Sequence, residues 1–392
     1  MKTHQNPWGH AVVGWGALSA LGAWLRTEPA PRRVFFLVDE NTHEACLQLV
    51  HPEVPDGCAV EVLEVPAGES SKEPEMALSL WEALREHGAH REDVLIAVGG
   101  GMITDLGGFV AATYKRGMRY AAVPTSLLAM VDASVGGKSG VNLMGLKNAV
   151  GTFYRAEGVF VDPIFLETLP SREVAAGWAE MIKHAYLDGG EHWNTIGQFA
   201  VAEAVTVEQL IQLSLAFKSR LVEQDPEDRT GVRAALNAGH TVGHALEALA
   251  WTDVSEKQRN DLESGSRASP VAAPEPLLHG EAVAAGLWME SWVAEARGLQ
   301  PAADANALRS LVRAYFGRVP VPALDEAWAV MLQDKKNRTD EVRMALLQAA
   351  GIRDGEPLIA LAPGSVWATK RWPSYDALAR ELVALLPHAR VV

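Results

Sequence analysis

Short apolar runs alternate with amphipathic stretches through the first 165 residues of the chain. The apolar runs are rich in Val, Phe, Leu and Ile, which favours buried strands, and the amphipathic stretches repeat at the period of a helix. Strands are expected at 34–38, 59–65, 94–98, 120–123 and 159–161, with helices such as 75–86 between them. The alternation predicts parallel strands joined by crossovers, and hence a doubly wound α/β nucleotide-binding domain over residues 1–170.

The pattern changes after Pro170, where long helical repeats replace the alternation. Helices are expected at 172–187, 202–223, 232–250 and 280–297, which indicates a mostly α-helical, metal-binding domain over residues 171–341. The segment 251–276 is polar and rich in Ser, Pro and Ala, so it cannot bury enough apolar surface to offset its ordering entropy. We expect a mobile loop there. Residues 342–392 form a separate C-terminal tail.

An apolar stretch near the N-terminus, at 11–25, is too short to span a membrane. Gly14, Gly16, Ser19 and Gly22 interrupt it, which favours a short strand and a helix over the core of a signal sequence. No membrane partner is therefore expected.

Composition narrows the functional class further. The 392 residues are 48% hydrophobic and 21% charged, values typical of a globular chain long enough for two domains. The formal charge of −14 repels phosphate backbones, which argues against a nucleic-acid partner. Cys46 and Cys58 are the only cysteines, which fits a reducing compartment such as the cytoplasm and leaves metal binding to histidines and carboxylates.

Polar or glycine-rich clusters follow three of the predicted strands. Gly99–Gly101 ends one strand and opens a helix, so that backbone N–H groups can approach a pyrophosphate, although the spacing is not GxGxxG and a plain tight turn is the alternative. Asp39 follows another strand and suits ribose hydroxyls, its alternative being a helix N-cap. Glu69 and Lys72 follow the third, where a solvated turn is the alternative. Together the clusters predict a nucleotide crevice at the carboxyl edge of the sheet.

The stretch 123–142 surrounds Asp132 and Lys138 with small residues, and Lys147 and Asn148 follow it. Cations and an amide beside glycine-rich backbone suit a phosphate or another oxyanion. A surface loop is the alternative interpretation.

A metal site is predicted from the helical half. His240 and His244 are four residues apart, which puts both imidazoles on one helix face, although such pairs also arise by chance. His279 opens another helix, and Glu180 lies with Lys183 on a third. Two histidines and a carboxylate leave coordination positions open, as in catalytic metal sites.

The last candidate site residues are basic. They could also belong to ordinary solvated helix faces. In an acidic chain, cations gathered near metal ligands would attract an anionic substrate. They are Lys218, Arg229, Arg233, Lys335 and Lys336.

These motifs occur in a fixed order that resembles the 3-dehydroquinate synthase family, of the sugar-phosphate cyclase group, over about residues 10–340. The stretches that carry the resemblance are GGGMITD, VPTSLLAMVDASVGGKSGVN, LKNAVGTFY, AEMIK, LNAGHTVGHALE, LLHGEAVAAG and DKKN. The resemblance implies NAD in the N-terminal domain, zinc or cobalt in the helical domain, a sugar-phosphate substrate and a homodimer.

The resemblance also implies a role for each matching position. The implied metal ligands are Glu180, His240 and His279. The implied NAD-binding residues are Asp39, Asn41, Glu69, Lys72, Gly100, Gly101, Met102, Asp105, Thr125, Ser126, Asp132, Lys138 and Lys147. The implied substrate-binding and catalytic residues are Lys138, Lys147, Asn148, Lys183, Lys218, Arg233, Asn237, His244 and one of Lys335 or Lys336, with Arg116 reaching the neighbouring subunit's phosphate.

The implied activity converts 3-deoxy-D-arabino-heptulosonate 7-phosphate to 3-dehydroquinate and phosphate, a lyase step of the shikimate pathway. It proceeds by transient NAD-dependent oxidation, phosphate elimination, re-reduction and intramolecular aldol closure. Another cyclase of the valiolone or deoxyinosose type is the first alternative. A non-catalytic nucleotide-binding module is the second.

Three features depart from the family pattern. Thr125-Ser126 stands where the family often has two threonines, which keeps a hydroxyl. The segment between His244 and His279 is longer than in the family. The tail at 342–392 resembles the start of the nucleotide-sugar half of a heptosyltransferase-type glycosyltransferase, and is too short to supply a catalytic domain of its own.

Overall fold

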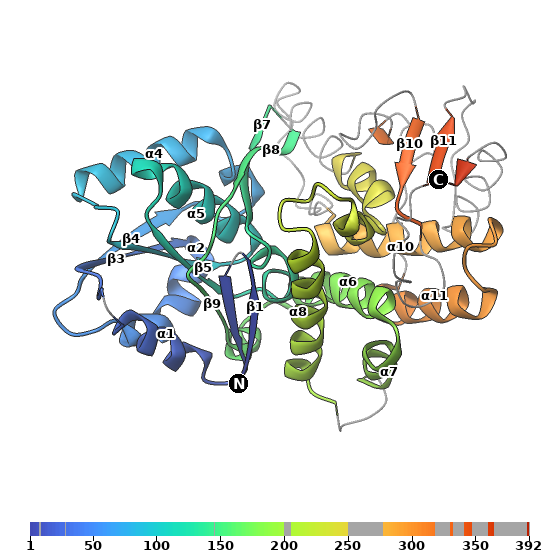
Figure 1. Cartoon of the computed structure of the whole chain (residues 1–392), viewed down its shortest axis with the longest axis horizontal. Helices are drawn as coiled ribbons and strands as arrows, with labels where there is room; N and C mark the ends of the chain where they lie inside the picture. Colours follow the sequence, from blue (N-terminus) through green and yellow to red (C-terminus); the bar gives the residue numbers. More distant parts are fainter. Residues whose placement is uncertain are drawn as a thin grey trace, which may run out of the picture. The chain divides into compact units, whose positions relative to one another are not determined.

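The computed structural model describes residues 1–7, 9–27, 29–144, 146–199, 205–249, 277–317, 330–331, 341–346, 360–363 and 390–391. The chain forms two compact units (Figure 1). The first contains Met1–Gly177 and Val201–Arg229, and the second contains Trp178–Ala200 and Thr230–Val392. The units group residues by spatial proximity, and the domain boundaries expected near residues 170 and 341 stay predictions.

A seven-stranded sheet forms the centre of the first unit, in the order β1-β2-β9-β6-β5-β3-β4. Only β1 pairs antiparallel, with β2, and the other neighbours are parallel. The five predicted strands are confirmed. The interior ones, such as β3 and β5, are apolar runs buried on both faces of the sheet, and β4 is a half-exposed edge strand in which Val alternates with Glu. The strands of this sheet are β1 (Lys2–Asn6), β2 (Gly9–Val13), β3 (Arg33–Asp39), β4 (Ala59–Val65), β5 (Val94–Gly99), β6 (Arg119–Pro124) and β9 (Gly158–Val161).

Helices cover both faces of this sheet, as the doubly wound prediction requires. In Figure 1, α4 (Pro74–Glu86) and α5 (Gly101–Thr113) lie on one face and α1 (Ala17–Leu25) lies on the other. The strand β2 followed by α1 confirms the strand-and-helix interpretation of the apolar stretch 11–25. Shorter helical segments fill the connections: α2 (Glu40–Thr42), η1 (His43–Leu47), α3 (Gln48–Val50), η2 (His51–Glu53), η3 (Glu69–Ser71), η4 (Tyr114–Arg116), η5 (Ala129–Ala133) and η6 (Pro163–Glu167).

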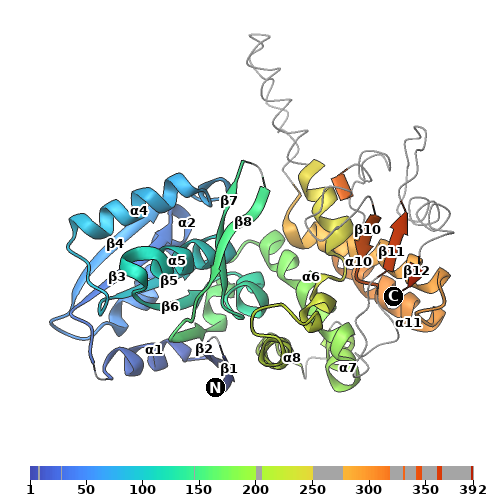
Figure 2. The ribbon, with the colours of Figure 1, turned by 45° about the horizontal axis from the view of Figure 1, so that its top comes forward.

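A two-stranded antiparallel hairpin, β7 (Lys138–Leu143) with β8 (Leu146–Phe153), was not predicted (Figure 2). Its sequence lacks alternation because most of β8 is exposed, and glycines occupy paired positions. A Cβ on Gly140 would lie 2.6 Å from the Val150 carbonyl oxygen, and one on Gly151 would lie 2.6 Å from that of Ser139. The glycines that resemble a loop in the sequence therefore allow two backbones to pair closely.

Helix α8 (Val207–Gln224) belongs to the first compact unit. It begins with a capping box: Gln209 N–H donates to Thr206 Oγ1 at 3.3 Å, and Thr206 N–H donates to Gln209 Oε1 at 2.9 Å. The helix was expected at 202–223, and residues 201–204 lie outside the described part of the chain. The capping box explains why the described helix starts where it does.

The second unit is helical, as predicted. The helices expected at 172–187 and 280–297 are confirmed as α6 and α10, whereas α7 and α11 were not predicted. The described helices are α6 (Ser171–Asp188), which continues from the first unit, α7 (Gly190–Phe199), the 3-10 segment η7 (Val232–Asn237), a helix over 240–249, α10 (His279–Ala296) and α11 (Ala302–Phe316).

The prediction of one continuous helix at 232–250 is wrong in one respect. The helix is interrupted at Ala238 and Gly239, which separate the 3-10 segment η7 from the helix that starts at His240. Gly239 has a φ of +78°, in the left-handed region that favours glycine. A Cβ there would also lie 2.8 Å from the Val283 carbonyl oxygen of α10. The break therefore brings the backbone against α10 and starts a new helix at His240.

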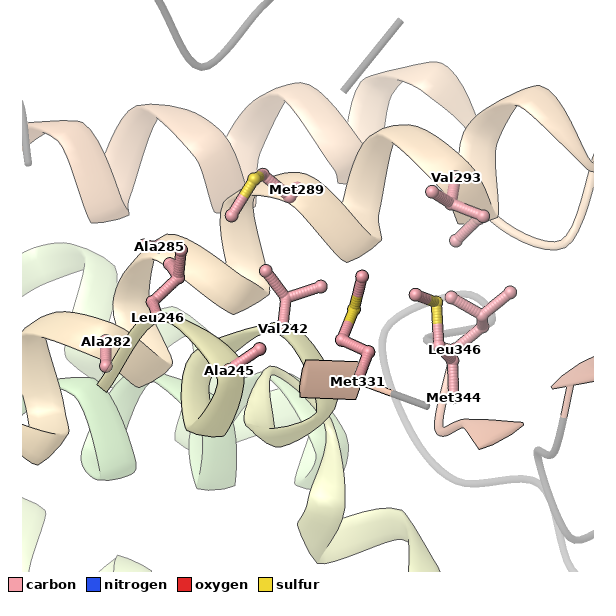
Figure 3. Packing of buried hydrophobic residues seen from close by; sticks show 11 residues of the cluster. Val242, Ala245, Leu246, Ala282, Ala285, Met289, Val293, Met331, Met344 and Leu346 are labelled. Carbon is pink, nitrogen blue, oxygen red and sulfur yellow. The ribbon is translucent and has the colours of Figure 1, made fainter. Parts of the chain in front are cut away.

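A buried cluster joins the helix over 240–249 to α10, as Figure 3 shows. The cluster includes Val242 of the first helix, Met289 and Val293 of α10, and two residues of the tail, Met344 and Leu346. The tail's first strand, β10 (Glu341–Met344), pairs with β11 (Ala360–Pro363), which pairs with β12 (Arg390–Val391). At least Met344 and Leu346 of the tail therefore pack in the core of the second unit.

Two further expectations concern the rest of the chain. The loop expected at 251–276 lies outside the described residues. Among the residues that the structure describes, no helix combines the length and the apolar character needed to cross a membrane.

Candidate active site

The glycine-rich turn after β5 leads directly into α5. Gly100 is the N-cap of this helix, and the first turn of α5 carries no acidic residue. A Cβ on Gly100 would lie 3.2 Å from Ser126 Oγ, and one on Gly101 would lie 3.3 Å from the Ala133 Cβ. The backbone N–H groups at the N-terminus of α5 can therefore bind a pyrophosphate. No carboxylate in the first turn of the helix would repel it.

Asp39 ends β3 and caps the short helix α2. Its Oδ1 accepts bonds from the N–H groups of Asn41, at 3.0 Å, and Thr42, at 2.9 Å. The N-cap alternative is therefore confirmed for Asp39. These bonds all use Oδ1, so capping does not occupy Oδ2, and the ribose-binding role stays a prediction.

Lys72 and Glu69 connect three segments that are far apart in sequence. The Lys72 ammonium is buried and lies 2.5 Å from Asp105 on α5. Glu69 accepts a bond from the Asn142 side chain of the hairpin at 2.9 Å, and the Lys72 carbonyl accepts from the Asn142 N–H at 2.7 Å. Burial raises the pKa of Asp105, and the Lys72 charge partly opposes this. The network supports the predicted grouping of Glu69, Lys72 and Asp105.

Two lysines of the substrate set form ion pairs within the first unit. Lys218 on α8 is buried and lies 2.6 Å from the Asp132 carboxylate. Lys138, at the start of β7, is half-exposed and pairs with Asp228, whose φ is +53°. Each lysine is thus held by a carboxylate.

The other predicted residues of the first unit lie at strand and helix ends. Thr125 follows β6 and is buried, and its N–H donates to the Gly99 carbonyl at 3.0 Å. Asn148 on β8 donates its N–H to Asn142 Oδ1 at 2.9 Å. Arg116 ends η4, exposed and with a φ of +64°. Met102 lies in the first turn of α5, and Lys147 is exposed on β8.

Glu180, His240 and His279 converge in the second unit. One ligand atom from each lies within 4.8 Å of the others. Glu180 Oε1 is 3.4 Å from His240 Nε2 and 3.6 Å from His279 Nε2. Glu180 is fully buried, and the two imidazoles are 11% and 29% exposed, so the cluster keeps an open side.

The donor set fits a divalent metal. Two imidazole nitrogens and one carboxylate oxygen suit zinc or cobalt and leave positions open for substrate. The second nitrogen of each ring also has a partner: His240 Nδ1 lies 3.1 Å from the Ala238 carbonyl, and His279 Nδ1 lies 3.4 Å from Glu247. Burial lowers the pKa of His279, but hydrogen bonds to Glu180 and Glu247 outweigh it and raise the pKa to about 9.

Further predicted residues surround this cluster. Lys183 lies one turn after Glu180 on α6, is buried, and forms an ion pair with it. The ring of His244 lies 5.1 Å from that of His240 and 5.9 Å from that of His279. Arg233, which is buried, and Asn237 belong to the segment that precedes His240. Lys335 and Lys336 lie outside the described residues.

Comparison of the sequence with known protein families identifies the relatives of this chain. Residues 62–176 match the family described as 3-dehydroquinate synthase N-terminal, and residues 177–255 match 3-dehydroquinate synthase C-terminal. A 3-dehydroquinate synthase from Parabacteroides distasonis is 37% identical over 328 residues, which cover 81% of this chain and 85% of the relative. The chain belongs to the 3-dehydroquinate synthase family.

A second family member, from Latilactobacillus sakei, is 42% identical over 75% of this chain and 76% of its own length. Solved structures with the same fold include a 2-deoxy-scyllo-inosose synthase complexed with carbaglucose-6-phosphate, NAD+ and Co2+, with a TM-score of 0.75 and 21% identity, covering 97% of this chain and 99% of that one. A 2-epi-5-epi-valiolone synthase from Streptomyces hygroscopicus with NAD+ and Zn2+ has a TM-score of 0.73 and 22% identity, and covers 98% of both chains. At these identities the two structures confirm the fold class.

Sequence reasoning missed four polar residues that contact members of the predicted site. Glu247 had a signal, because it lies seven residues after His240 and therefore on the same face of a helix. The other three are placed by tertiary contacts that spacing does not reveal. They are Asn142, which contacts Glu69; Asp228, which contacts Lys138; and Glu290, which contacts the backbone on either side of His240.

Proposed function

We propose that this chain converts 3-deoxy-D-arabino-heptulosonate 7-phosphate to 3-dehydroquinate and phosphate, using NAD and a zinc or cobalt ion. The convergence of Glu180, His240 and His279 on one point carries the proposal. Membership of the 3-dehydroquinate synthase family supports the substrate and product.

The first unit would hold NAD. The Gly100 and Gly101 turn would bind the pyrophosphate, Asp39 would bind ribose hydroxyls through Oδ2, and Lys72 would hold Asp105 and Glu69 in place. The chemistry that bound NAD supplies is reversible hydride transfer. The same set extends to Asn41, Met102, Thr125, Ser126, Asp132, Lys138 and Lys147.

The second unit would hold the metal through Glu180, His240 and His279. The chemistry that a bound zinc or cobalt ion supplies is Lewis acidity toward a substrate hydroxyl. Lys183 keeps the Glu180 carboxylate in place and adds a positive charge beside it. His244 stands next to both ligand imidazoles and would contact the substrate phosphate.

Cationic side chains would bind the carboxylate and phosphate of the substrate. Lys138 and Lys218 already pair with carboxylates, so a substrate anion would replace or share these contacts. Buried cations bind anions strongly because little water competes for them. The proposed set is Lys138, Lys147, Asn148, Lys183, Lys218, Arg233, Asn237 and one of Lys335 or Lys336.

A homodimer in the cytoplasm is part of the proposal. Arg116 supports the dimer, because it is exposed at the end of η4 and would reach the substrate phosphate of a neighbouring subunit. The free thiols of Cys46 and Cys58 are compatible with a reducing compartment.

Phosphate release tests the function. Purified protein is mixed with NAD, Zn2+ and the heptulosonate phosphate, and phosphate is measured before chelation, after chelation, and after Zn2+ or Co2+ is returned. We expect release that is lost on chelation and restored by either metal. His240→Ala should abolish it, whereas His87→Ala, which removes a surface histidine paired with Glu61, should not.

Each alternative predicts a different result in the same assay. Release only from sedoheptulose 7-phosphate would favour a valiolone-type cyclase. No metal-dependent release, with NAD still bound, would favour the non-catalytic module.

A further inference from the structure

The two ligand histidines differ in what holds the nitrogen that faces away from the metal cluster. His240 Nδ1 lies 3.1 Å from the carbonyl oxygen of Ala238, two residues before it in the chain. His279 Nδ1 lies 3.4 Å from Glu247 Oε2, which comes from a different helix. The first partner is a neutral backbone group and the second is a carboxylate.

Both partners select the same imidazole tautomer. A carbonyl oxygen and a carboxylate accept hydrogen bonds and cannot donate them, so each Nδ1 is the N–H donor. In the metal-binding form each ring carries a single proton, which stays on Nδ1 and leaves the lone pair on Nε2. Both Nε2 atoms face Glu180 Oε1, at 3.4 and 3.6 Å. The outer contacts therefore turn both rings so that a lone pair points into the metal cluster.

The Glu247 carboxylate affects its imidazole more strongly than the Ala238 carbonyl affects the other one, because the carboxylate is charged. Glu247 is only 4% exposed, so solvent screens its charge weakly. A buried carboxylate beside the N–H of an imidazole increases the electron-donating power of the other nitrogen. His279 gains this effect from Glu247, while the corresponding nitrogen of His240 faces the neutral Ala238 carbonyl.

His279 also depends more on a side-chain partner for its position. It is the first residue of α10, so few neighbours on its own helix restrain it, and its side chain is 29% exposed against 11% for His240. Glu247 lies one turn after His244 on the helix that carries His240. It thus ties the ligand on α10 to the helix that supplies the other ligand histidine.

We propose that Glu247 is a positioning residue of the metal site, which orients His279 and strengthens its bond to the divalent ion. This inference rests on the proposed function in that it takes Glu180, His240 and His279 as the metal ligands.

Two substitutions separate orientation from charge. Glu247→Gln keeps an acceptor oxygen at the same reach and removes the charge, whereas Glu247→Ala removes both. The control is Glu295→Gln, which lies on the same helix as His279 and breaks a 2.6 Å ion pair with Arg309 away from the cluster. Metal-free protein is titrated with Co2+ against a chromophoric chelator, and the visible Co2+ spectrum and NAD affinity are recorded.

We expect Glu247→Ala to weaken Co2+ binding by roughly 10–100-fold and Glu247→Gln by less, with altered Co2+ spectra and unchanged NAD affinity. Glu295→Gln should bind Co2+ like the parent protein. Co2+ affinity and spectra that are unchanged in both Glu247 variants would overturn the proposal. Circular dichroism checks folding, and if the alanine variant does not fold, the isosteric glutamine variant decides the question.

The outcome is separable from that of the proposed function. Parent protein that binds Co2+ but releases no phosphate from the heptulosonate phosphate would refute the activity, while the Co2+ affinities would still decide the role of Glu247. Parent protein that binds no Co2+ would overturn both the metal site and the role of Glu247.

Discussion

Replacing Gly286 with alanine would force apart the two segments that carry His240 and His279. A Cβ on Gly286 of α10 would lie 1.8 Å from the carbonyl oxygen of Gly239 and 2.7 Å from its carbonyl carbon. Real Cβ atoms stay at least 3.0 Å from such neighbours, so the oxygen contact must lengthen by at least 1.2 Å, the difference between 3.0 and 1.8 Å. The obstacle is backbone, and no side chain can rotate to relieve it.

The energetic cost follows from two opposing effects. Overpacking of a buried contact typically costs about 1–3 kcal/mol, and a clash with rigid backbone falls at the upper end. The higher helix propensity of alanine returns up to about 1 kcal/mol. A net loss of about 2 kcal/mol corresponds to a fall of about 4–8 °C in the unfolding midpoint of a domain of this size. The 5.3 Å separation of the His240 and His279 rings should also widen, which would weaken Co2+ binding.

Thermal unfolding of the metal-free protein, followed by circular dichroism, measures the first effect, and Co2+ titration measures the second. Gly197→Ala is the matched control, because Gly197 lies inside α7 and a Cβ there would meet nothing within 4 Å. That control should unfold at the same temperature as the parent or slightly higher. If Gly286→Ala unfolds at the same temperature as Gly197→Ala and binds Co2+ as tightly as the parent, the close packing of Gly286 on Gly239 does not determine the geometry of the metal site.

Three further predictions rest on buried groups. Glu290→Ala should lower the free energy of unfolding by about 2–4 kcal/mol in urea denaturation, because it strips two buried N–H groups, which donate at 2.6 and 3.3 Å, of their acceptor; a loss below 0.5 kcal/mol would contradict this. Lys72→Met should weaken NAD binding and raise the pKa of Asp105 further, since the ammonium opposes the effect of burial. A carboxyl with a raised folded-state pKa loses its stabilising contribution as pH rises from the ordinary Asp pKa through the raised one. This variant should therefore lose more stability than the parent as pH rises above the ordinary Asp range, about 1–3 kcal/mol, and Asp105→Asn in the same chain should remove the difference. Burial raises the pKa of Cys46 to about 11, so a thiol reagent at pH 8 should modify the more accessible Cys58 first, and equal rates at the two thiols would refute the assignment.

Most of the parallel strands were predictable because they are short apolar runs buried on both faces, and the edge strand β4 was predictable from its alternation of Val and Glu. β3 and β5 show the apolar run most clearly, since nearly every residue in them is buried. The hairpin of β7 and β8 carries the opposite pattern, with exposed positions and paired glycines, and its strands exist because their backbones pair and pack on α5. Periodicity cannot report a strand that buries so little of its own apolar surface.

The metal cluster could be predicted only in part, because local spacing reveals some of its residues and tertiary packing places the others. The spacing of His240 and His244 is local, and the predicted helices offered His279 and Glu180 as further candidates. The choice of Glu180, His240 and His279 as the ligands came from the resemblance to the family. The helix break at Gly239 and the outer contact of Glu247 depend on how α10 packs, so local spacing does not specify them. For Asp39 the structure confirms the cap, and the nucleotide role needs a bound ligand to test it.

The strand β11 shows that strand pairing in a β-sheet depends on the main chain more than on the side chains. Ala362 and Pro363 stand opposite Val342 and Glu341 of β10. The strand they extend leads into Met344 and Leu346, which the core of the second unit encloses. Hydrogen bonds between main chains are available to almost any sequence, so the pairing of β11 places few demands on its side chains. The ladder can therefore hold β10, and with it Met344 and Leu346, in place while the side chains of β11 vary.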